Sequence, residues 1–262
     1  MVTQEEVERG LRTLGLGKGS HVLAHASFNS FGGVEGGPAT VVSALVEMVS
    51  TVMMPAFTWE RPQVWDVSGL VPGNAYRPEP PPDASPVPFS CDLPIDTEIG
   101  VIAETLRTAY RVRRSGHPLA SFIAYGELAD FLSGTGDDTN QLQPIERLLA
   151  ADGEVLLLGV GHTASTGVHF AEWLAGRRLF VRHALTKEGV KAVLCGGCSD
   201  AFDELQPHVA HLERRTAVGE STLRAYRLRP YVEAARRLIE ADPEALLCDC
   251  DRCEAHKARA RA

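Results

Sequence analysis

Apolar residues recur along the chain with two different periods, one typical of helices and one typical of buried strands. Residues 3–16 place apolar side chains three and four positions apart, whereas residues 154–160 form an almost uninterrupted apolar run. The same criteria predict further helices over 38–50, 99–110, 127–132 and 231–240, and further strands over 21–26, 51–57, 121–124 and 192–195. Because strands and helices alternate, we expect an α/β fold with a central, mostly β-sheet core flanked by helices.

Two segments depart from this alternation. Residues 61–95 hold more than half of the prolines, including three in a row at 80–82, and cannot form a helix or a central strand. We expect a long Pro-rich loop at the active site, since unstructured loops of this length inside a compact domain are commonly functional. Residues 241–262 are a Cys-rich tail. With 262 residues, we expect a single domain over 1–262.

Composition narrows the class of protein. The chain is 44% hydrophobic and 23% charged, as in ordinary globular proteins. It has no apolar run long enough to span a membrane and no visible signal peptide, so the expected location is cytoplasmic, without a membrane partner. Its net charge of −8 disfavours nucleic acid and suits a cationic partner, although solubility alone also explains it.

The strongest candidate for chemistry follows the strand at 154–160. A Gly-rich turn leads into a predicted helix carrying Thr166, His169 and Glu172. The last two lie three positions apart, on one helical face. Imidazole is the usual general base near neutral pH, and a carboxylate beside it fixes its tautomer. A surface ion pair or half of a metal site would show the same spacing.

Five of the six cysteines lie at or after residue 195. Cys195 and Cys198 form one C-x2-C pair and Cys250 and Cys253 another, a pattern that suits tetrahedral zinc. Cys248 and His256 are spare ligands beside the second pair. A structural zinc site would tie the tail to the sheet, and reduced thiols or a disulfide are the alternatives.

Residues 156–173, LLLGVGHTASTGVHFAEW, resemble the signature of the aminoglycoside N3-acetyltransferase family (the antibiotic N-acetyltransferase fold). Thr166, His169 and Glu172 stand at matching positions, whereas Ser165 replaces an asparagine. Four more segments are similar to family motifs, in the same order: 23–32, 53–58, 99–107 and 114–122. The resemblance covers roughly residues 10–240.

This resemblance implies transfer of acetyl from acetyl-CoA to the 3-amino group of a 2-deoxystreptamine aminoglycoside. His169 would be the general base, Glu172 would orient it, and Thr166 would contact the thioester or its oxyanion. If a third acidic residue completes the site beside His169, the candidates are Asp200, Asp203 and Glu204. The expected coenzyme A contacts are Ser27, Phe28, Asn29, Ser30, Phe31, Gly32, Arg114, Ser115 and His117.

Three other hypotheses stay open at this point. The acceptor of an N-acyltransferase could be another amine, such as a polyamine or an intermediate of natural-product metabolism. A zinc-dependent hydrolase would use His169 and Glu172 with a Cys/His metal site. A protein that only binds coenzyme A or an amine would use the same pocket without chemistry. The sequence leaves monomer and dimer open.

Overall fold

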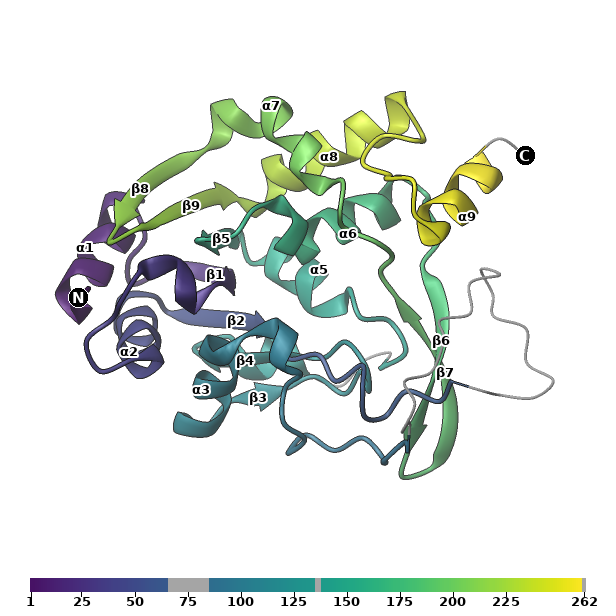
Figure 1. Ribbon diagram of the computed structural model, residues 1–262, viewed down its shortest axis with the longest axis horizontal. Helices are drawn as coiled ribbons and strands as arrows, with labels where there is room; N and C mark the ends of the chain where they lie inside the picture. Colours follow the sequence, from purple (N-terminus) through teal and green to yellow (C-terminus); the bar gives the residue numbers. More distant parts are fainter. Residues whose placement is uncertain (66–84, 135–137, 261–262) are drawn as a thin grey trace.

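The computed structural model describes residues 1–65, 85–134 and 138–260. Seven strands make up its central sheet: β1 (His21–Ala26), β2 (Thr51–Pro55), β3 (Arg113–Arg114), β4 (Phe122–Gly126), β5 (Glu154–Leu158), β8 (Arg214–Val218) and β9 (Ser221–Arg227). Their spatial order is β3-β4-β2-β1-β5-β9-β8 (Figure 1). β1 pairs in parallel with both β2 and β5, and the other neighbours are antiparallel. The carboxyl ends of these three parallel strands therefore meet at one edge, where α/β sheets bind ligands.

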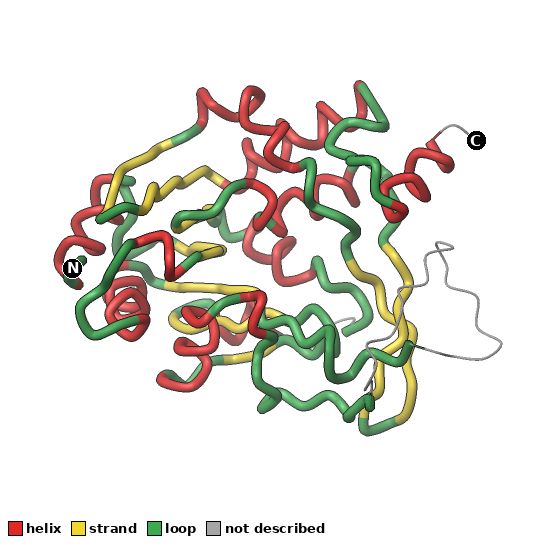
Figure 2. Tube along the Cα trace, viewed as in Figure 1, coloured by secondary structure: helices red, strands yellow, loops and turns green. Residues whose placement is uncertain are grey.

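Helices cover both faces of the sheet, as Figures 1 and 2 show. One face carries α1 (Gln4–Thr13), α2 (Pro38–Met48) and α3 (Val101–Ala109). The other carries α4 (Ala129–Ser133), α5 (Gln143–Ala150), α6 (Thr166–Leu174) and α8 (Leu228–Ala241). Shorter helical segments are η1 (Phe28–Phe31), η2 (Thr97–Ile99), η3 (His162–Ala164), η4 (Phe202–Leu205), α7 (Gln206–Val209) and η5 (Ala210–Leu212).

The uninterrupted apolar run of β5 explains this layering. Successive side chains of a strand point to opposite faces, so Leu156 and Leu158 enter one core cluster while Val155 and Leu157 enter the other. All four are fully buried. Burying a Val or Leu side chain contributes about 1.5–3 kcal/mol relative to exposure, which makes β5 a rigid base for the turn that follows it.

A two-stranded ribbon projects beside the sheet (Figure 1). It consists of β6 (Phe180–Thr186) and β7 (Gly189–Cys195), paired antiparallel. The first described part of the Pro-rich segment runs along it, with the Val64 amide donating to the His183 carbonyl at 2.8 Å. The helix α9 (Asp251–Ala260) ends the described chain near the ribbon. Of the predicted Pro-rich loop 61–95, residues 66–84 lie outside the described residues, as do 261 and 262 of the predicted tail.

The predicted fold class is confirmed, and each predicted helix and strand is present, with ends that coincide for β1 and shift by a few residues elsewhere. The capping box of Thr3 and Glu6 begins α1, and Pro38 begins α2. The apolar pattern does not predict the strands β3, β6, β8 and β9, or the helices α5 and α9. β6 has few buried positions, and the polar residues of β8 and β9 leave only short apolar runs in the sequence, so none of these three strands stands out. Among the described residues, no helix is long and apolar enough to cross a membrane.

Candidate active site

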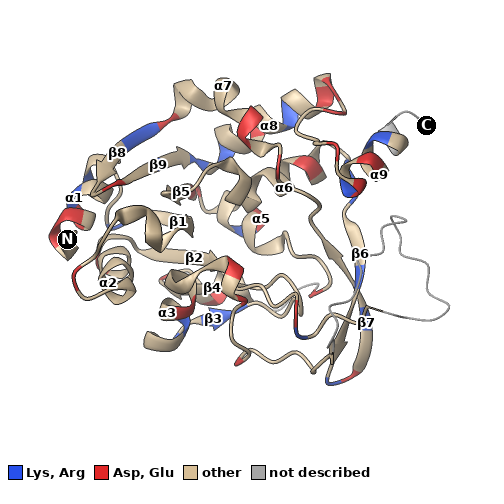
Figure 3. Ribbon diagram, viewed as in Figure 1, with Lys and Arg blue, Asp and Glu red and all other residues tan. Residues whose placement is uncertain are grey.

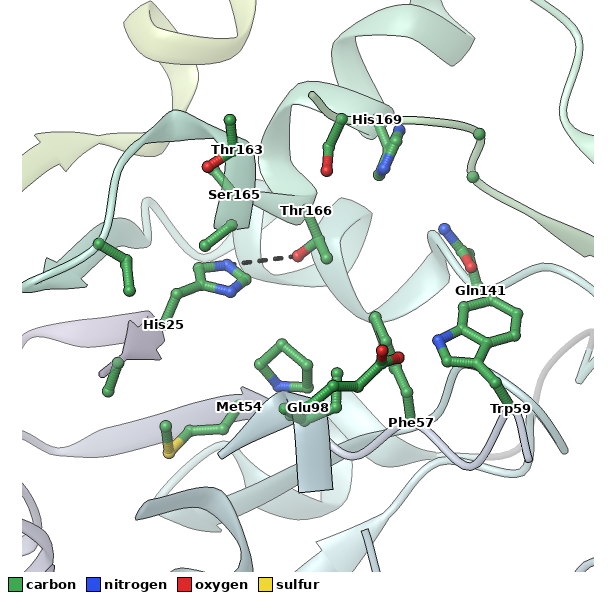
Figure 4. Close-up of a pocket in the computed structure, with 18 of the residues that line it drawn as sticks. His25, Met54, Phe57, Trp59, Glu98, Gln141, Thr163, Ser165, Thr166 and His169 are labelled. Carbon is green, nitrogen blue, oxygen red and sulfur yellow. Dashed lines mark hydrogen bonds between the residues drawn. The ribbon is translucent and has the colours of Figure 1, made fainter. Parts of the chain in front are cut away.

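A cavity of about 540 Å³ lies at the carboxyl ends of β1 and β2, beside the first turn of α6 (Figure 4). Strand ends, the turn before α6, the loop after β7 and the C-terminal segment all contribute to its walls. Polar, charged and aromatic side chains and two glycines stand out among the residues that line it: His25, Trp59, Gln63, Trp65, Glu98, Gln141, Thr166, His169, Arg182, Gly196, Gly197 and Arg252. The strand-end position predicted for the site is therefore where the structure has its cavity.

His169 is the centre of a buried chain of polar groups. Its Nδ1–H donates to Oε2 of Glu172 at 2.6 Å, and Oε1 of Glu172 accepts from Arg177 at 2.5 Å. This pairing sets the tautomer, because a ring that donates through Nδ1 carries its lone pair on Nε2. His169 lines the cavity, and its ring edge packs on Phe202 at 4.8 Å between centroids. The predicted pair is thus brought together with the geometry of a base and its orienting carboxylate.

Glu172 is held as a carboxylate although it is 4% exposed. Burial by itself raises the pKa of Glu172, but the hydrogen bond from His169 and the charges of His169 and Arg177 outweigh it and hold that pKa below its ordinary value. Arg177 also donates to the carbonyl oxygens of Pro243 and Ala245, at 3.0 and 2.8 Å. Through Glu172 and Arg177, α6 is therefore fastened to the C-terminal segment.

His25, near the end of β1, faces the first turn of α6. Its Nε2 is 3.4 Å from Oγ1 of Thr166 (Figure 4). Burial, with the nearby His169 as a second cause, lowers the pKa of His25 to about 3. A neutral imidazole thus stands next to the Thr166 hydroxyl. Ser165 occupies the N-cap of α6, but its side chain does not cap the helix.

The loop after β7 packs closely against the His169 ring. A Cβ added to Gly196 would come within 2.8 Å of the His169 ring and 2.9 Å of Nε2 of Gln141. A Cβ added to Gly197 would lie 2.7 Å from the Phe180 ring. Only glycine allows the backbone to approach this closely.

The remaining walls mix aromatic rings with polar groups. Arg182 of β6 lies over the Trp59 ring, 5.3 Å from its centroid. Figure 3 shows basic positions on β6 and α9 near this end of the molecule. Among the described residues that line the cavity, the charged ones are Glu98, Arg182 and Arg252. Buried side-chain atoms without a hydrogen-bond partner among the described residues include Oε1 of Gln63, Nε1 of Trp65 and Oε1 of Gln141.

The loop expected to bind coenzyme A, Ser27 to Gly32, follows the cavity-lining end of β1 and forms η1. Ser30 donates to the Ser27 carbonyl at 2.7 Å and shares a hydrogen bond with Ser221 at 2.9 Å. Phe31 is buried in the core, whereas Phe28 is half-buried and Asn29 and Gly32 are exposed. The loop is thus rigid, with an exposed outer surface.

Arg114, Ser115 and His117 are buried, and none of them is among the residues that line the cavity. Arg114 donates to the Ala56 carbonyl at 2.6 Å, and Oγ of Ser115 accepts from the Phe122 amide at 2.9 Å. His117 accepts from two backbone amides through Nδ1 and donates through Nε2 to the Leu194 carbonyl at 3.2 Å. Their contacts fix the backbone behind the cavity.

Asp203 is the acidic candidate that the structure brings near the Gly-rich turn. Its Oδ1 accepts from the His162 amide at 2.6 Å, so it supports the turn and does not pair with His169. Asp200 donates its amide to Sγ of Cys198, and Glu204 lies exposed on η4. The group that completes the His169–Glu172 pair is Arg177, which the sequence pattern does not indicate. The sequence does not show which of two consecutive arginines, Arg177 or Arg178, would contact Glu172.

The four cysteines predicted as one ligand set are not brought together. Cys195 is fully buried in β7, where burial raises the pKa of its thiol to about 12. The sulfurs that cluster belong to Cys198, Cys248, Cys250 and Cys253, all within 4.8 Å of one another. Cys248, a spare ligand in the sequence-based prediction, takes the place expected for Cys195. The C-x2-C spacing predicted Cys195 as the partner of Cys198, whereas the fold places the sulfur of Cys248 next to that of Cys198.

Known proteins match most of the chain. A family model described as aminoglycoside 3-N-acetyltransferase matches residues 23–240. The aminoglycoside N(3')-acetyltransferase-like protein YokD of Bacillus subtilis is 33% identical over 187 residues, which are 65% of each chain. Aminoglycoside N(3)-acetyltransferase III of Salmonella sp is 36% identical over 183 residues, 67% of this chain and 62% of the relative. The matched region therefore spans less than two thirds of these relatives' own length.

Solved structures extend the likeness over nearly the whole chain. The crystal structure of apo aminoglycoside acetyltransferase AAC(3)-IVa aligns with a TM-score of 0.80 at 27% identity, covering 98% of both chains. A histidine-to-alanine mutant of that enzyme in complex with a gentamicin aligns with a TM-score of 0.79 at 27% identity, covering 98% of this chain and 97% of the other. Fold, motifs and family match agree, and the chain belongs to the aminoglycoside 3-N-acetyltransferase family.

Proposed function

We propose that this protein is an N-acetyltransferase that moves acetyl from acetyl-CoA to an amine, with the 3-amino group of a 2-deoxystreptamine aminoglycoside as the first acceptor to test. The observation that carries the proposal is the buried chain from His169 through Glu172 to Arg177 at the edge of the cavity. Membership of the family supports the reaction class, and the gentamicin complex of AAC(3)-IVa supports the choice of acceptor.

In this mechanism Nε2 of His169 takes a proton from the acceptor amine as its nitrogen attacks the thioester carbonyl. A protonated amine has no lone pair for this attack, so a base within hydrogen-bond reach is required. Glu172 accepts the Nδ1–H bond and stabilises the imidazolium, while Arg177 keeps the carboxylate in place. The carbon–nitrogen bond forms, the carbon–sulfur bond breaks, and the coenzyme A thiolate then takes up the proton.

Thr166 is proposed to stabilise the oxyanion of the tetrahedral intermediate. When neutral His25 carries its proton on Nε2, it donates to Oγ1 of Thr166 across 3.4 Å. The hydroxyl hydrogen of Thr166 is then left to donate to the developing negative charge. The low pKa of His25 keeps a positive charge away from His169, which must itself become positive during the reaction.

Acetyl-CoA is proposed to lie against the loop from Ser27 to Gly32, whose exposed outer surface follows the cavity-lining end of β1. Arg114, Ser115 and His117 are proposed to act through the backbone they hold, since their polar atoms bond to carbonyls and amides behind the cavity. A cytoplasmic location is part of the proposal, because the proposed reaction uses acetyl-CoA.

One observation favours a second acceptor class. The charged lining residues among those described are one carboxylate, Glu98, and two guanidinium groups, Arg182 and Arg252. A polycation gains little from such a wall, whereas an amine that also carries a carboxylate or phosphate would be attracted to it. The second candidate is therefore N-acetylation of an amine with an anionic group.

A thiol-release assay tests both candidates. Coenzyme A release is followed with dithiodipyridine against a protein-only blank, using 2-deoxystreptamine aminoglycosides, amines that carry carboxylate or phosphate, and simple amines. Release with an aminoglycoside, with the product acetylated at N3, supports the first candidate. Release only with anionic amines supports the second, and no release with any amine overturns the acetyltransferase proposal.

The zinc-hydrolase hypothesis gains no support from the geometry. Among the described residues, the group of possible metal ligands is the sulfur cluster, which includes neither His169 nor Glu172. Four thiolates close a zinc coordination sphere, whereas catalytic zinc keeps one position open.

A further inference from the structure

Four cysteine sulfurs meet where the C-terminal segment reaches the loop after β7. Sγ of Cys248 lies 3.6 Å from Sγ of Cys198 and 3.5 Å from Sγ of Cys253, and Cys250 completes a group within 4.8 Å. Tetrahedral zinc–sulfur bonds of about 2.3 Å place neighbouring sulfurs about 3.8 Å apart. A disulfide would need about 2.05 Å, and the cysteines are all free. The two distances from Sγ of Cys248 are close to the zinc value, and the group as a whole is compact enough for a four-thiolate zinc site.

The backbone around the sulfurs supports such a site. The Asp200 amide donates to Sγ of Cys198 at 3.5 Å, a contact that stabilises a thiolate. Leu246, two residues before Cys248, has a φ of 61°, which is uncommon for leucine, and is 1% exposed. The buried Leu246 side chain anchors this turn to the core, and the turn positions Cys248, the first cysteine of the C-terminal segment.

The cluster is joined to the cavity through consecutive residues. Gly196 lies against the His169 ring, Gly197 lies against Phe180 and His256 of α9, and Cys198 supplies a sulfur. On the other side of the cluster, Arg252 lies between Cys250 and Cys253 in the sequence and lines the cavity. Any ligand that fixes the four sulfurs therefore fixes two parts of the cavity wall.

We propose that Cys198, Cys248, Cys250 and Cys253 bind one structural zinc ion, which fastens the C-terminal segment to the loop after β7 and so holds Arg252 in the wall of the cavity. Zinc suits this set because thiolates are its preferred structural ligands and four of them complete a tetrahedron. The metal assignment does not depend on the proposed function, whereas the effect on substrate binding rests on it.

Elemental analysis of untagged, purified protein tests the metal. We expect about one zinc per chain in the wild type and in Cys195→Ala, and a loss of at least fivefold in Cys248→Ser. Cys195→Ala is the matched control, because it removes a buried cysteine of the C-x2-C motif outside the cluster. Equal zinc in Cys248→Ser, loss of zinc in Cys195→Ala, or a wild type with less than about a tenth of a zinc per chain would each overturn the assignment.

A second measurement needs no variant, so it answers the question even where Cys248→Ser does not fold. Wild-type protein is titrated with a mercurial reagent while zinc release is read with a metallochromic indicator. Release in step with modification of clustered thiols supports the site. A disulfide among the four cysteines, found by mass spectrometry of the alkylated chain, overturns it.

The role in the cavity has its own test. Arg252→Met is expected to keep its zinc and to change the acceptor KM about tenfold, with kcat changed less than threefold. Because it removes a positive charge from the cavity wall, the KM should rise for an amine that carries a carboxylate or phosphate and fall for a polycationic aminoglycoside. Arg237→Met, on the exposed surface of α8, is the control and should change neither. An unchanged acceptor KM in Arg252→Met overturns this part while leaving the metal assignment standing, and absence of thiol release in the wild type would overturn the proposed function instead.

Discussion

Two walls of the same cavity are assembled in different ways. The first is the start of α6, where His169 and Glu172 are three residues apart on a helix that follows the most deeply buried strand. The second joins Gly196 and Gly197 to Arg252, which come from the ribbon end and the C-terminal segment. The first wall is encoded locally and the second depends on long-range contacts. We therefore expect changes in the first to affect turnover with every acceptor, and changes in the second to have smaller effects.

Removing the base should have the largest effect. In His169→Ala we expect kcat to fall by about 10²–10⁴-fold with every acceptor, because general-base catalysis is worth that much. The KM values for acetyl-CoA and acceptor should change only a few fold. Steady-state kinetics measure this, and circular dichroism checks that the fold is kept. A variant that retains more than a tenth of the wild-type kcat would show that His169 is not the base.

Changes to the partners of His169 should lower kcat less than its removal does, with a larger loss for Glu172, which contacts His169, than for Arg177, which contacts Glu172. Glu172→Gln keeps a hydrogen-bond acceptor but loses the charge that stabilises the imidazolium, so we expect kcat to fall about 10²-fold. Arg177→Met leaves the carboxylate bonded to His169 and should cost about tenfold. The measurement is kcat for both variants at saturating substrates. A larger loss in Arg177→Met than in Glu172→Gln would contradict this order.

The sequence predicts the first wall better than the second, because the first is encoded locally and the second depends on long-range contacts. The base pair can be predicted because a helix places residues three apart on one face, and because the adjoining strand is marked by its apolar run. The parallel core strands can be predicted for the same reason. The whole chain as a single domain stays a prediction.

The second wall cannot be predicted from local patterns. Arg177 is not predicted because it follows the end of α6, and the chain must turn there for Arg177 to contact Glu172. Cys248 is not predicted because sequence spacing does not show which sulfurs a fold brings together. β6, β8 and β9 carry too few consecutive apolar residues to stand out. Long-range packing decides these positions, and a single sequence does not record it.

The contact between the walls gives a third, smaller prediction. In Gly196→Ala the new methyl group would meet the His169 ring at 2.8 Å, so the ring or the loop must shift. Because small misplacements of a catalytic group are costly, we expect kcat/KM to fall about tenfold. Gly17→Ala is the matched control, since its Cβ would have no neighbour within 4 Å. Equal kcat/KM values in Gly196→Ala and Gly17→Ala would contradict the prediction and mean that the loop moves aside without displacing the His169 ring.

The effect expected to be smallest at neutral pH is on folding stability, and it involves His25 of β1, which faces the first turn of α6 and bears no proposed charge. Its pKa is lowered to about 3 in the folded protein by burial and by nearby His169, against 6.5 in an unfolded chain. The unfolded state therefore binds the extra proton first. This group's contribution to stability is complete above about pH 6.5 and is lost as pH falls, at up to about 1.4 kcal/mol per pH unit.

Replacing His25 by glutamine keeps a polar side chain and removes the titration. We expect His25→Gln to flatten the fall in unfolding free energy between about pH 6 and pH 4, and to change it little at pH 7.5 beyond any loss of packing. Urea unfolding at a series of pH values measures the slope, with His211→Gln at an exposed position as the control. If the slope in His25→Gln equals that of the wild type, protonation of His25 does not set the acid sensitivity of the fold.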